Sequence, residues 1–174
     1  MKMPFVMKAI AVSCGLLTVL FIFLQWDTAA ITFGTTCYHF SMRLLVGLVV
    51  DCIMQNKADY RKAWYQQRDW EGKLYKALGI RKWKGRFPTY DPSLFDSKKH
   101  TLDEIVQATC QAEVVHEVIA VLSFLPLLGA IPFGSFGVFA IMSLLAACFD
   151  MIFVIMQRFN RPRLVKIINK KSTQ

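Results

Sequence analysis

Glu113, His116 and Glu117 have the spacing that places three side chains on one face of a helix. A carboxylate beside an imidazole orients the ring, selects its tautomer and raises its basicity, which prepares the ring to take a proton from a hydroxyl. We therefore predict His116 as a catalytic base and Glu113 as its catalytic partner. Two alternatives stay open: a polar interfacial helix face that bonds Arg43 or the central segment, and a pair of metal ligands. The metal alternative ranks last, because this spacing is common by chance, and we predict no bound metal.

An arginine-rich string, Gln157–Leu164, follows the last apolar run of the chain. Guanidinium groups grip phosphates through paired hydrogen bonds, whereas a lysine offers only a point charge. Asn160 adds an amide to the string, and Pro162 fixes the direction of the backbone. We predict that the string binds the phosphates of a substrate; the alternative is a basic anchor that holds lipid headgroups. The predicted substrate-binding residues are Arg158, Asn160, Arg161 and Arg163, together with Lys84 from the central segment.

Asp150 lies inside the last apolar run, where an ionised carboxylate requires a cationic or hydrogen-bonding partner. It shares a helical stripe with Gln157 and Arg161, and we include it among the substrate-binding candidates. Arg43, in an earlier apolar run, is the available cation. We therefore predict that Arg43 and Asp150 form a structural pair or line a polar pocket.

The elements that must position these residues are membrane helices. Of the 174 residues, 55% are apolar, yet 21 Lys and Arg stand against 12 Asp and Glu. The apolar residues form long runs and the basic residues lie between them, which is typical of an integral membrane protein. A soluble domain would contain much shorter apolar runs. No recognised motif accompanies the basic charge, so we expect no nucleic-acid partner.

The apolar runs predict an all-α integral membrane protein, one membrane domain over residues 1–174 with about four transmembrane helices. A signal peptide is the alternative for the first run, but the run is long for a signal core and we predict a retained helix. The second run is weakly apolar at its start, and it either spans the membrane or forms a re-entrant segment. A basic segment with interleaved tryptophans follows it, and we expect this interfacial segment to lie on the membrane surface. The predicted segments are 9–26, 28–50, the interfacial segment 51–104, 105–130, 135–157 and a basic tail, 158–174.

Local signals set boundaries within this plan. Thr101 followed by Glu104 forms a capping box, which predicts the start of the third helix. Residues 71–78 have the pattern of a short amphipathic helix that ends at Gly79. Prolines and glycines between residues 126 and 137 predict a tight turn, and a fourth helix follows to about residue 156.

The distribution of basic residues predicts the orientation in the membrane. Four crossings place both termini and residues 51–104 on one side, and every Lys and Arg except Arg43 then falls on that side. Positive residues accumulate on the cytoplasmic side of membrane proteins. We therefore expect a multi-pass protein of the cell membrane with both termini cytoplasmic.

Short motifs occur in an order and at a spacing that point to a known family. They are Arg81-Lys-Trp-Lys84, Asp103-Glu-Ile105, Ala112-Glu113 with Val115-His116, and Gln157-Arg158 with Asn160-Arg-Pro-Arg-Leu164. Over about residues 70–165 they resemble the glycosyl-4,4'-diaponeurosporenoate acyltransferase family, and the Asn-Arg-Pro-Arg-Leu string is the most specific part. In that family a tryptophan follows the histidine, whereas Glu117 stands here, and residues 35–43 have no counterpart. We therefore expect a divergent member and do not carry the carotenoid substrate over.

The resemblance implies transfer of a fatty acyl group to a sugar hydroxyl of a glycolipid at the cytoplasmic membrane face. The matching positions are Trp83, Lys84, Glu113, His116, Arg158, Asn160, Arg161 and Arg163. The resemblance adds Trp83 to the predicted substrate-binding residues. We predict a membrane-embedded O-acyltransferase with His116 as general base, acyl-CoA or another activated acyl donor as substrate, and no bound cofactor. Membrane lipids and a lipid-linked acceptor are the expected partners, and an oligomer is compatible with the sequence. The alternatives are a non-catalytic membrane protein that binds or moves an anionic lipid or isoprenoid phosphate, and a scaffold subunit.

Overall fold

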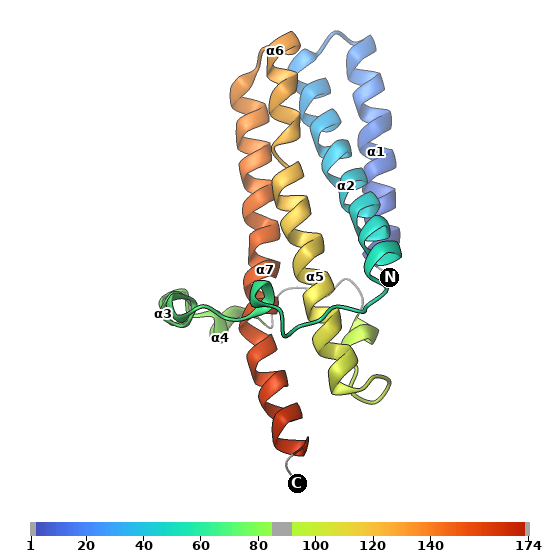
Figure 1. Cartoon of the computed structure of the whole chain (residues 1–174). Helices are drawn as coiled ribbons and strands as arrows, with labels where there is room; N and C mark the ends of the chain where they lie inside the picture. Colours follow the sequence, from blue (N-terminus) through green and yellow to red (C-terminus); the bar gives the residue numbers. More distant parts are fainter. Residues whose placement is uncertain (1–2, 85–91, 173–174) are drawn as a thin grey trace. The chain divides into compact units, whose positions relative to one another are not determined.

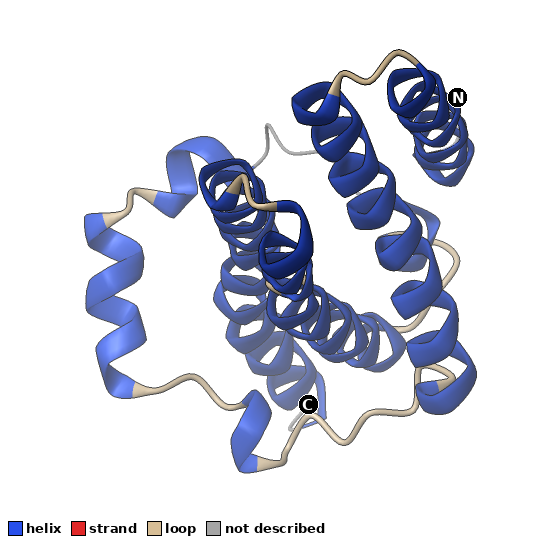
Figure 2. Ribbon diagram, turned by 90° about the horizontal axis from the view of Figure 1, so that it is seen from above, coloured by secondary structure: helices blue, strands red, loops and turns tan. Residues whose placement is uncertain are grey.

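The computed structural model describes residues 3–84 and 92–172, and these form helices, turns and loops but no strand (Figure 1, Figure 2). The long helices are α1 (Met3–Phe23), α2 (Asp27–Met54), α5 (Leu102–Leu122) and α7 (Phe136–Ser172). The shorter helices are η1 (Ala63–Tyr65), α3 (Asp69–Ala77), α4 (Ile80–Trp83), η3 (Pro92–Phe95), η4 (Leu125–Gly129) and α6 (Ala130–Phe133). The chain divides into a first unit, Met1–Val49 with Val115–Met151, and a second unit, Val50–Val114 with Ile152–Gln174.

Helical stretches long and apolar enough to cross a membrane account for much of the described chain. They are Met3–Phe23, Asp27–Met54, Leu102–Phe133 and Phe136–Lys171. The shortest has 21 residues and is therefore about 30 Å long, which matches the hydrocarbon core of a bilayer. The predicted all-α membrane fold with four candidate spanning helices is confirmed.

The second apolar run forms one unbroken helix, α2, which favours a spanning helix over the re-entrant alternative. The weakly apolar start that favoured this alternative is accommodated inside the helix. The hydroxyls of Thr32 and Thr36 each donate to the carbonyl one turn earlier, at 2.8 Å. A threonine can therefore lie in a membrane helix without an unsatisfied hydroxyl.

Helices α1 and α2 lie close together at Gly34 in the first unit. A Cβ placed on Gly34 of α2 would lie 3.4 Å from Cγ2 of Thr18 in α1. Such proximity favours helix pairs in lipid, where van der Waals packing and hydrogen bonds drive association. Tyr38 of α2 also donates to the carbonyl of Leu122 in α5, at 2.9 Å, so α2 contacts α5 as well.

The predicted turn before the fourth helix is confirmed. Helix α5 ends at Leu122, η4 and α6 follow, and Gly134 and Ser135 have φ angles of 66° and 51° before α7 begins. Glycine adopts positive φ without strain, so Gly134 suits this position. The turn reverses the chain between two candidate spanning stretches.

The predicted boundaries within the second unit are also confirmed. The backbone N–H of Thr101 donates to Oε2 of Glu104 at 2.7 Å, and the backbone N–H of Glu104 donates to Oγ1 of Thr101 at 3.2 Å. Helix α3 ends before Gly79, which has a left-handed conformation with φ of 60°. These caps position α5 and the described part of the interfacial segment, of which residues 85–91 lie outside the described chain.

Helix α7 differs from the prediction, because it continues to Ser172 instead of ending near residue 156. The helix includes Pro162, and a proline inside a helix costs about 3 kcal/mol through a lost hydrogen bond and a steric clash. Packing offsets this cost: Leu164, Val165 and Ile168 lie against a buried cluster of the second unit. The cluster consists of Ala58, Tyr60, Val106 and Cys110. The predicted basic tail is therefore helical up to Ser172.

Candidate functional site

His116 contacts a buried ion pair in the first unit. Its Nδ1 lies 2.9 Å from Oδ1 of Asp150, and the other oxygen of Asp150 accepts a hydrogen bond from Arg43. Arg43 also donates to the backbone carbonyls of His39 and Ala146, at 3.1 and 3.3 Å. The side chains of Asp150, Arg43 and His116 are 2%, 13% and 21% exposed. The Arg43–Asp150–His116 cluster therefore includes a partly accessible imidazole.

This cluster has the arrangement of an oriented general base. In the tautomer that carries the proton on Nδ1, the ring donates to Asp150 and the lone pair is on Nε2. Arg43 donates a hydrogen bond to Asp150, and this carboxylate can stabilise the imidazolium that forms when the ring takes a proton. The cluster can therefore accept a proton from a hydroxyl and return it later.

The predicted pairing of Arg43 with Asp150 is confirmed. The carboxylate at Nδ1 of His116 is Asp150, whereas the sequence predicted Glu113 in this role. Both oxygens of Glu113 accept hydrogen bonds from arginines of α7. The prediction rested on helical spacing alone, and a buried carboxylate gains more from two guanidinium groups than from one neutral ring.

Two other buried polar side chains of the first unit have no hydrogen-bond partner within the described residues. His39 is 4% exposed with neither ring nitrogen bonded, and Ser143 is 0% exposed with its hydroxyl unbonded. A buried polar group without a partner costs about 1–3 kcal/mol. The sequence left the role of His39 open, and the structure places it one turn before Arg43 on α2.

Arg158 is the centre of a hydrogen-bond network in the second unit. Its Nε and Nη2 donate to Oε1 of Glu71, at 3.1 and 2.6 Å, and its Nη1 donates to Oε1 of Glu113 at 2.6 Å. Nη1 and Nη2 also donate to the backbone carbonyls of Trp64 and Gln66, each at 2.9 Å. An arginine has five N–H donors, so every donor of Arg158 has an acceptor in the protein.

Arg161 completes this network nearly one turn further along α7. It donates to Oε2 of Glu113, to the hydroxyl of Thr109 at 3.0 Å and to the carbonyl of Thr109 at 3.1 Å. Its Nη1 donates to the carbonyl of Tyr65 at 2.9 Å. Arg161 is 2% exposed and Glu113 is fully buried. The arginine network, as we call this neutral group, consists of Arg158, Arg161, Glu71 and Glu113.

Glu71 is held as an anion in the arginine network. Burial raises the pKa of its carboxyl, but hydrogen bonds from Arg158 and Tyr75 outweigh burial, so the pKa lies below its ordinary value. The hydroxyl of Tyr75 donates to Glu71 at 2.6 Å, and burial together with this bond raises the pKa of Tyr75. The network thus ties the interfacial segment to α5 and α7 within the second unit, with its charges compensated.

The arginine string therefore contains residues of two kinds. Arg158 and Arg161 direct their donors to the protein itself, and a phosphate would have to displace a buried carboxylate to reach them. Arg163 is exposed, and its guanidinium carbon lies 4.7 Å from the centre of the Phe159 ring. Only the second kind is arranged to meet a ligand without breaking an internal ion pair.

The two predicted site residues of the interfacial segment have different contacts. Lys84 donates to Oδ1 of Asn160 at 2.6 Å, and its Nζ lies 5.0 Å from the centre of the Phe159 ring. Trp83 donates its indole N–H to the carbonyl of Leu78 at 2.9 Å. The structure therefore joins Lys84 to Asn160, while the described bond of Trp83 stays within its own segment.

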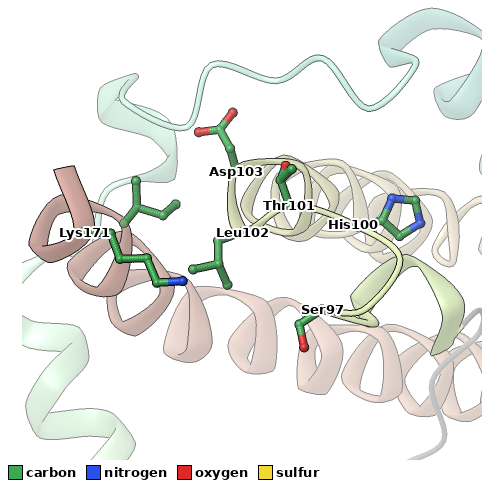
Figure 3. Close-up of a pocket in the computed structure, with 7 residues that line it drawn as sticks. Ser97, His100, Thr101, Leu102, Asp103 and Lys171 are labelled. Atoms are coloured by element: carbon green, nitrogen blue, oxygen red, sulfur yellow. The ribbon is translucent and has the colours of Figure 1, made fainter.

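The second unit has one surface hollow apart from these clusters and another that borders the arginine network. One of about 620 Å³ lies between the start of α5 and the end of α7 and is lined by His100, Asp103 and Lys171, among others (Figure 3). None of the predicted site residues lines it. Another, of about 290 Å³, includes Arg161 and Pro162 in its wall. The case for a site rests on side-chain chemistry and not on the size of a cavity.

The metal alternative for Glu113 and His116 has no donor set. Within residues 3–84 and 92–172, no group of three or more His, Cys, Asp or Glu side chains is arranged to hold a metal ion. A protein zinc site requires at least three such ligands. The two carboxylate oxygens of Glu113 are paired with Arg158 and Arg161 instead.

Sequence reasoning missed the residues that complete the arginine network. Glu71 and Tyr75 are four residues apart on the predicted amphipathic helix, and this spacing places them on one face. That signal could have shown that the two side chains act together. The carbonyls of Trp64, Tyr65 and Gln66 carry no signal of this kind, because every residue has a carbonyl.

The fold and the buried clusters define a helical membrane protein that holds acid–base groups inside candidate spanning helices. A family model described as glycosyl-4,4'-diaponeurosporenoate acyltransferase matches residues 61–170, and the chain belongs to this family. The match includes His116, Asp150 and the arginine network, whereas Arg43 lies outside it. No curated protein and no solved structure matches the chain. Family membership confirms the predicted resemblance and indicates an acyltransferase.

Proposed function

We propose that this chain is a membrane-embedded O-acyltransferase. It moves a fatty acyl group from acyl-CoA or another activated donor to a hydroxyl of a glycolipid or other lipid-linked acceptor. Family membership supports acyl transfer. The single observation that carries the assignment of a base is the contact of His116 Nδ1 with Asp150, which is itself paired with Arg43. A carboxylate that orients an imidazole serves acyl transfer on several unrelated folds.

In the proposed reaction, Nε2 of His116 takes the proton of the acceptor hydroxyl while the hydroxyl oxygen attacks the acyl carbonyl. The tetrahedral intermediate then collapses, and the carbon–sulfur bond of a thioester donor breaks. The imidazolium returns the proton to the leaving thiolate, so the products are the acylated acceptor and a free thiol. Asp150 remains ionised throughout and stabilises the imidazolium, and Arg43 balances the charge of Asp150.

The position of the base suits lipid substrates. His116 and Asp150 both lie in stretches that are long and apolar enough to span a membrane. An acyl chain can reach such a place from the bilayer, and the scarcity of water there limits hydrolysis of the activated donor. General base catalysis typically contributes a factor of about 10²–10⁴ to the rate.

The proposed reaction takes place at the cytoplasmic face of the cell membrane, with both termini cytoplasmic. The excess of Lys and Arg at the termini and in residues 51–104 supports this orientation. Reporter fusions test it: a phosphatase that is active only outside the cytoplasm should be active after Gly134 and inactive at the C-terminus. The opposite pattern would overturn the orientation and leave the assignment of the base intact.

The test of the base uses the whole chain in phospholipid nanodiscs, with radiolabelled palmitoyl-CoA as donor and dodecyl glucoside as acceptor. His116→Ala should lower ester formation by about 10²–10⁴. His100→Ala is the matched control, because His100 lines a surface hollow of the second unit and has no part in the proposed reaction. It should retain wild-type activity.

Two outcomes would contradict the proposal. Near-wild-type acyl transfer by folded His116→Ala protein would exclude His116 as the base. A wild-type protein that acylates no acceptor from several donors, yet retains a stoichiometric anionic lipid in mass spectra, would favour the non-catalytic alternative.

A further inference from the structure

We infer that Lys84, Asn160 and Arg163 form a binding site for a phosphate group, distinct from the arginine network. The inference deepens the proposed function, because it assigns the phosphate-bearing part of a substrate to particular residues of the second unit. It rests on the proposed function only for the statement that the ligand is a substrate. Phosphate binding itself is measured without turnover.

Two cationic side chains share one aromatic ring at this site. Nζ of Lys84 and the guanidinium carbon of Arg163 lie 5.0 and 4.7 Å from the centre of the Phe159 ring. Both distances are within the range of cation–π interactions. Tyr75 contacts the same ring edge-on, with centroids 5.7 Å apart, and so restrains its orientation. The ammonium of Lys84 and the guanidinium of Arg163 therefore both lie against Phe159.

The positive charges of Lys84 and Arg163 have no counter-ion among residues 3–84 and 92–172. No carboxylate of the described residues forms an ion pair with Lys84 or Arg163, whereas the ion pairs of the arginine network match each charge. Burial, and then the neighbouring Arg163 and Arg81, lower the pKa of Lys84. Like charges held near each other destabilise the site, and a bound anion removes that penalty.

The donors that remain match the oxygens of a phosphate. Lys84 uses one of its three N–H groups on Oδ1 of Asn160, at 2.6 Å. That bond leaves the amide N–H groups of Asn160 available, and Arg163 supplies the planar fork that binds two oxygens at once. Across the described residues, none of these remaining donors has a hydrogen-bond acceptor.

A phosphate monoester or a diphosphate suits this site better than a carboxylate does. A phosphate monoester offers three acceptor oxygens and about two negative charges near neutral pH, which balances one lysine and one arginine. Two substrates of the proposed reaction carry this chemistry. They are the nucleotide part of an acyl-CoA donor and the headgroup of a phosphorylated lipid acceptor.

The experiment measures binding to the whole chain in phosphatidylcholine nanodiscs by calorimetry, with coenzyme A and pyrophosphate as probes. The double variant Lys84→Met with Arg163→Gln should weaken binding by about ten-fold or more, the effect of one lost charge-assisted hydrogen bond. Arg61→Gln with Lys73→Met removes the same charge from exposed positions of the same unit and should change binding less than about two-fold. His116→Ala should bind like the wild type, so a failed base assignment and a failed phosphate site give different results.

A second arm distinguishes the two sources of the phosphate. Nanodiscs that contain phosphatidic acid are analysed by native mass spectrometry for retained lipid. Retention that depends on Lys84 and Arg163, without binding of coenzyme A, assigns the site to a lipid headgroup; the reverse assigns it to the donor.

Three results would overturn the inference. The first is the absence of binding of every probe to the wild type. The second is equal weakening by the test and control pairs, which would show a general effect of charge. The third is unchanged binding in Arg163→Gln, a single change at an exposed position that answers the question even where the double variant fails to fold.

Discussion

The Arg43–Asp150–His116 cluster and the arginine network contain similar ion pairs, but the carboxylates in them have different further partners. In each, a buried carboxylate accepts hydrogen bonds from an arginine. In the network, two glutamates balance two arginines, and backbone carbonyls take the donors of Arg158 that remain. In the cluster, the second oxygen of Asp150 contacts an imidazole, a group that can take up and release a proton in acid–base chemistry.

The difference shows how a structural arginine can be told from a functional one. An arginine whose five donors all have internal acceptors is part of the scaffold, because a ligand could bind it only by breaking those bonds. Arg158 meets this condition, and Arg163, in the same short string, does not. The arginine string therefore contains one residue that stabilises the fold and another whose donors can meet a ligand.

Asp150→Asn should have the largest effect of the variants, and it changes the Arg43–Asp150–His116 cluster. An amide favours the wrong tautomer of His116 and cannot stabilise an imidazolium, so ester formation should fall by about 10²–10⁴. Asp51→Asn is the matched control, because Asp51 is exposed and its side chain accepts a hydrogen bond from Gln111, at 2.9 Å, in the second unit. Equal activity of the two variants in the nanodisc assay would remove Asp150 from the proposed mechanism.

Glu113→Gln should lower the stability of the protein, because it changes the arginine network. The change leaves two buried guanidinium groups with half of their compensating charge, so the free energy of unfolding should fall by about 3–5 kcal/mol. Activity per folded molecule should persist. The measurement is denaturant unfolding in mixed micelles, with Glu104→Gln as a control on the same helix, because a glutamine there keeps the capping box.

A second possible result for Glu113→Gln would contradict the structural role of Glu113. Unchanged stability with lost acyl transfer would return Glu113 to the catalytic role that helical spacing predicted. Measuring both the free energy of unfolding and the rate of acyl transfer therefore separates residues that stabilise the fold from residues that act on the substrate.

The sequence predicted the elements far better than the contacts between them. The apolar runs, the capping box at Thr101 and the turn at Gly134 depend on neighbouring residues, and each was predicted correctly. The partner of His116 was not, because the choice between Glu113 and Asp150 depends on how α5 and α7 pack. Spacing along one helix identifies residues on one face, but it does not show which other helix supplies the counter-charge.

Helix α7 shows the same limit at the level of a boundary. The sequence predicted a fourth helix that ends near residue 156, before Pro162 and its basic neighbours. The helix continues because Leu164, Val165 and Ile168 bury their side chains against residues far away in the sequence. Local propensity therefore gave way to tertiary packing, as it often does for a single proline.

The stabilisation that the Arg158–Glu71 pair gives to the folded protein should depend on pH, and this effect should be smaller than that of Glu113→Gln. The pKa of Glu71 is lower in the folded protein than its ordinary value of 4.5. The folded state therefore binds fewer protons, and the stabilisation is fully present above that value and is lost as the pH falls through the folded pKa. Glu71→Gln should be less stable than the wild type at neutral pH and should lose less stability on acidification. Parallel unfolding curves from pH 7 to pH 3 would contradict this account of the Arg158–Glu71 pair.

His39→Phe should give the smallest effect, and its sign distinguishes a structural cost from a catalytic need. The ring of His39 is buried next to Tyr38 and has no hydrogen-bond partner among the described residues. An apolar ring of similar shape removes the desolvation penalty, so the free energy of unfolding should rise by about 1 kcal/mol. Acyl transfer should be unchanged, because the proposed reaction uses His116 and not His39. A more stable protein that has lost activity would show that His39 contacts a substrate group, and the proposed catalytic cluster would then extend one turn further along α2.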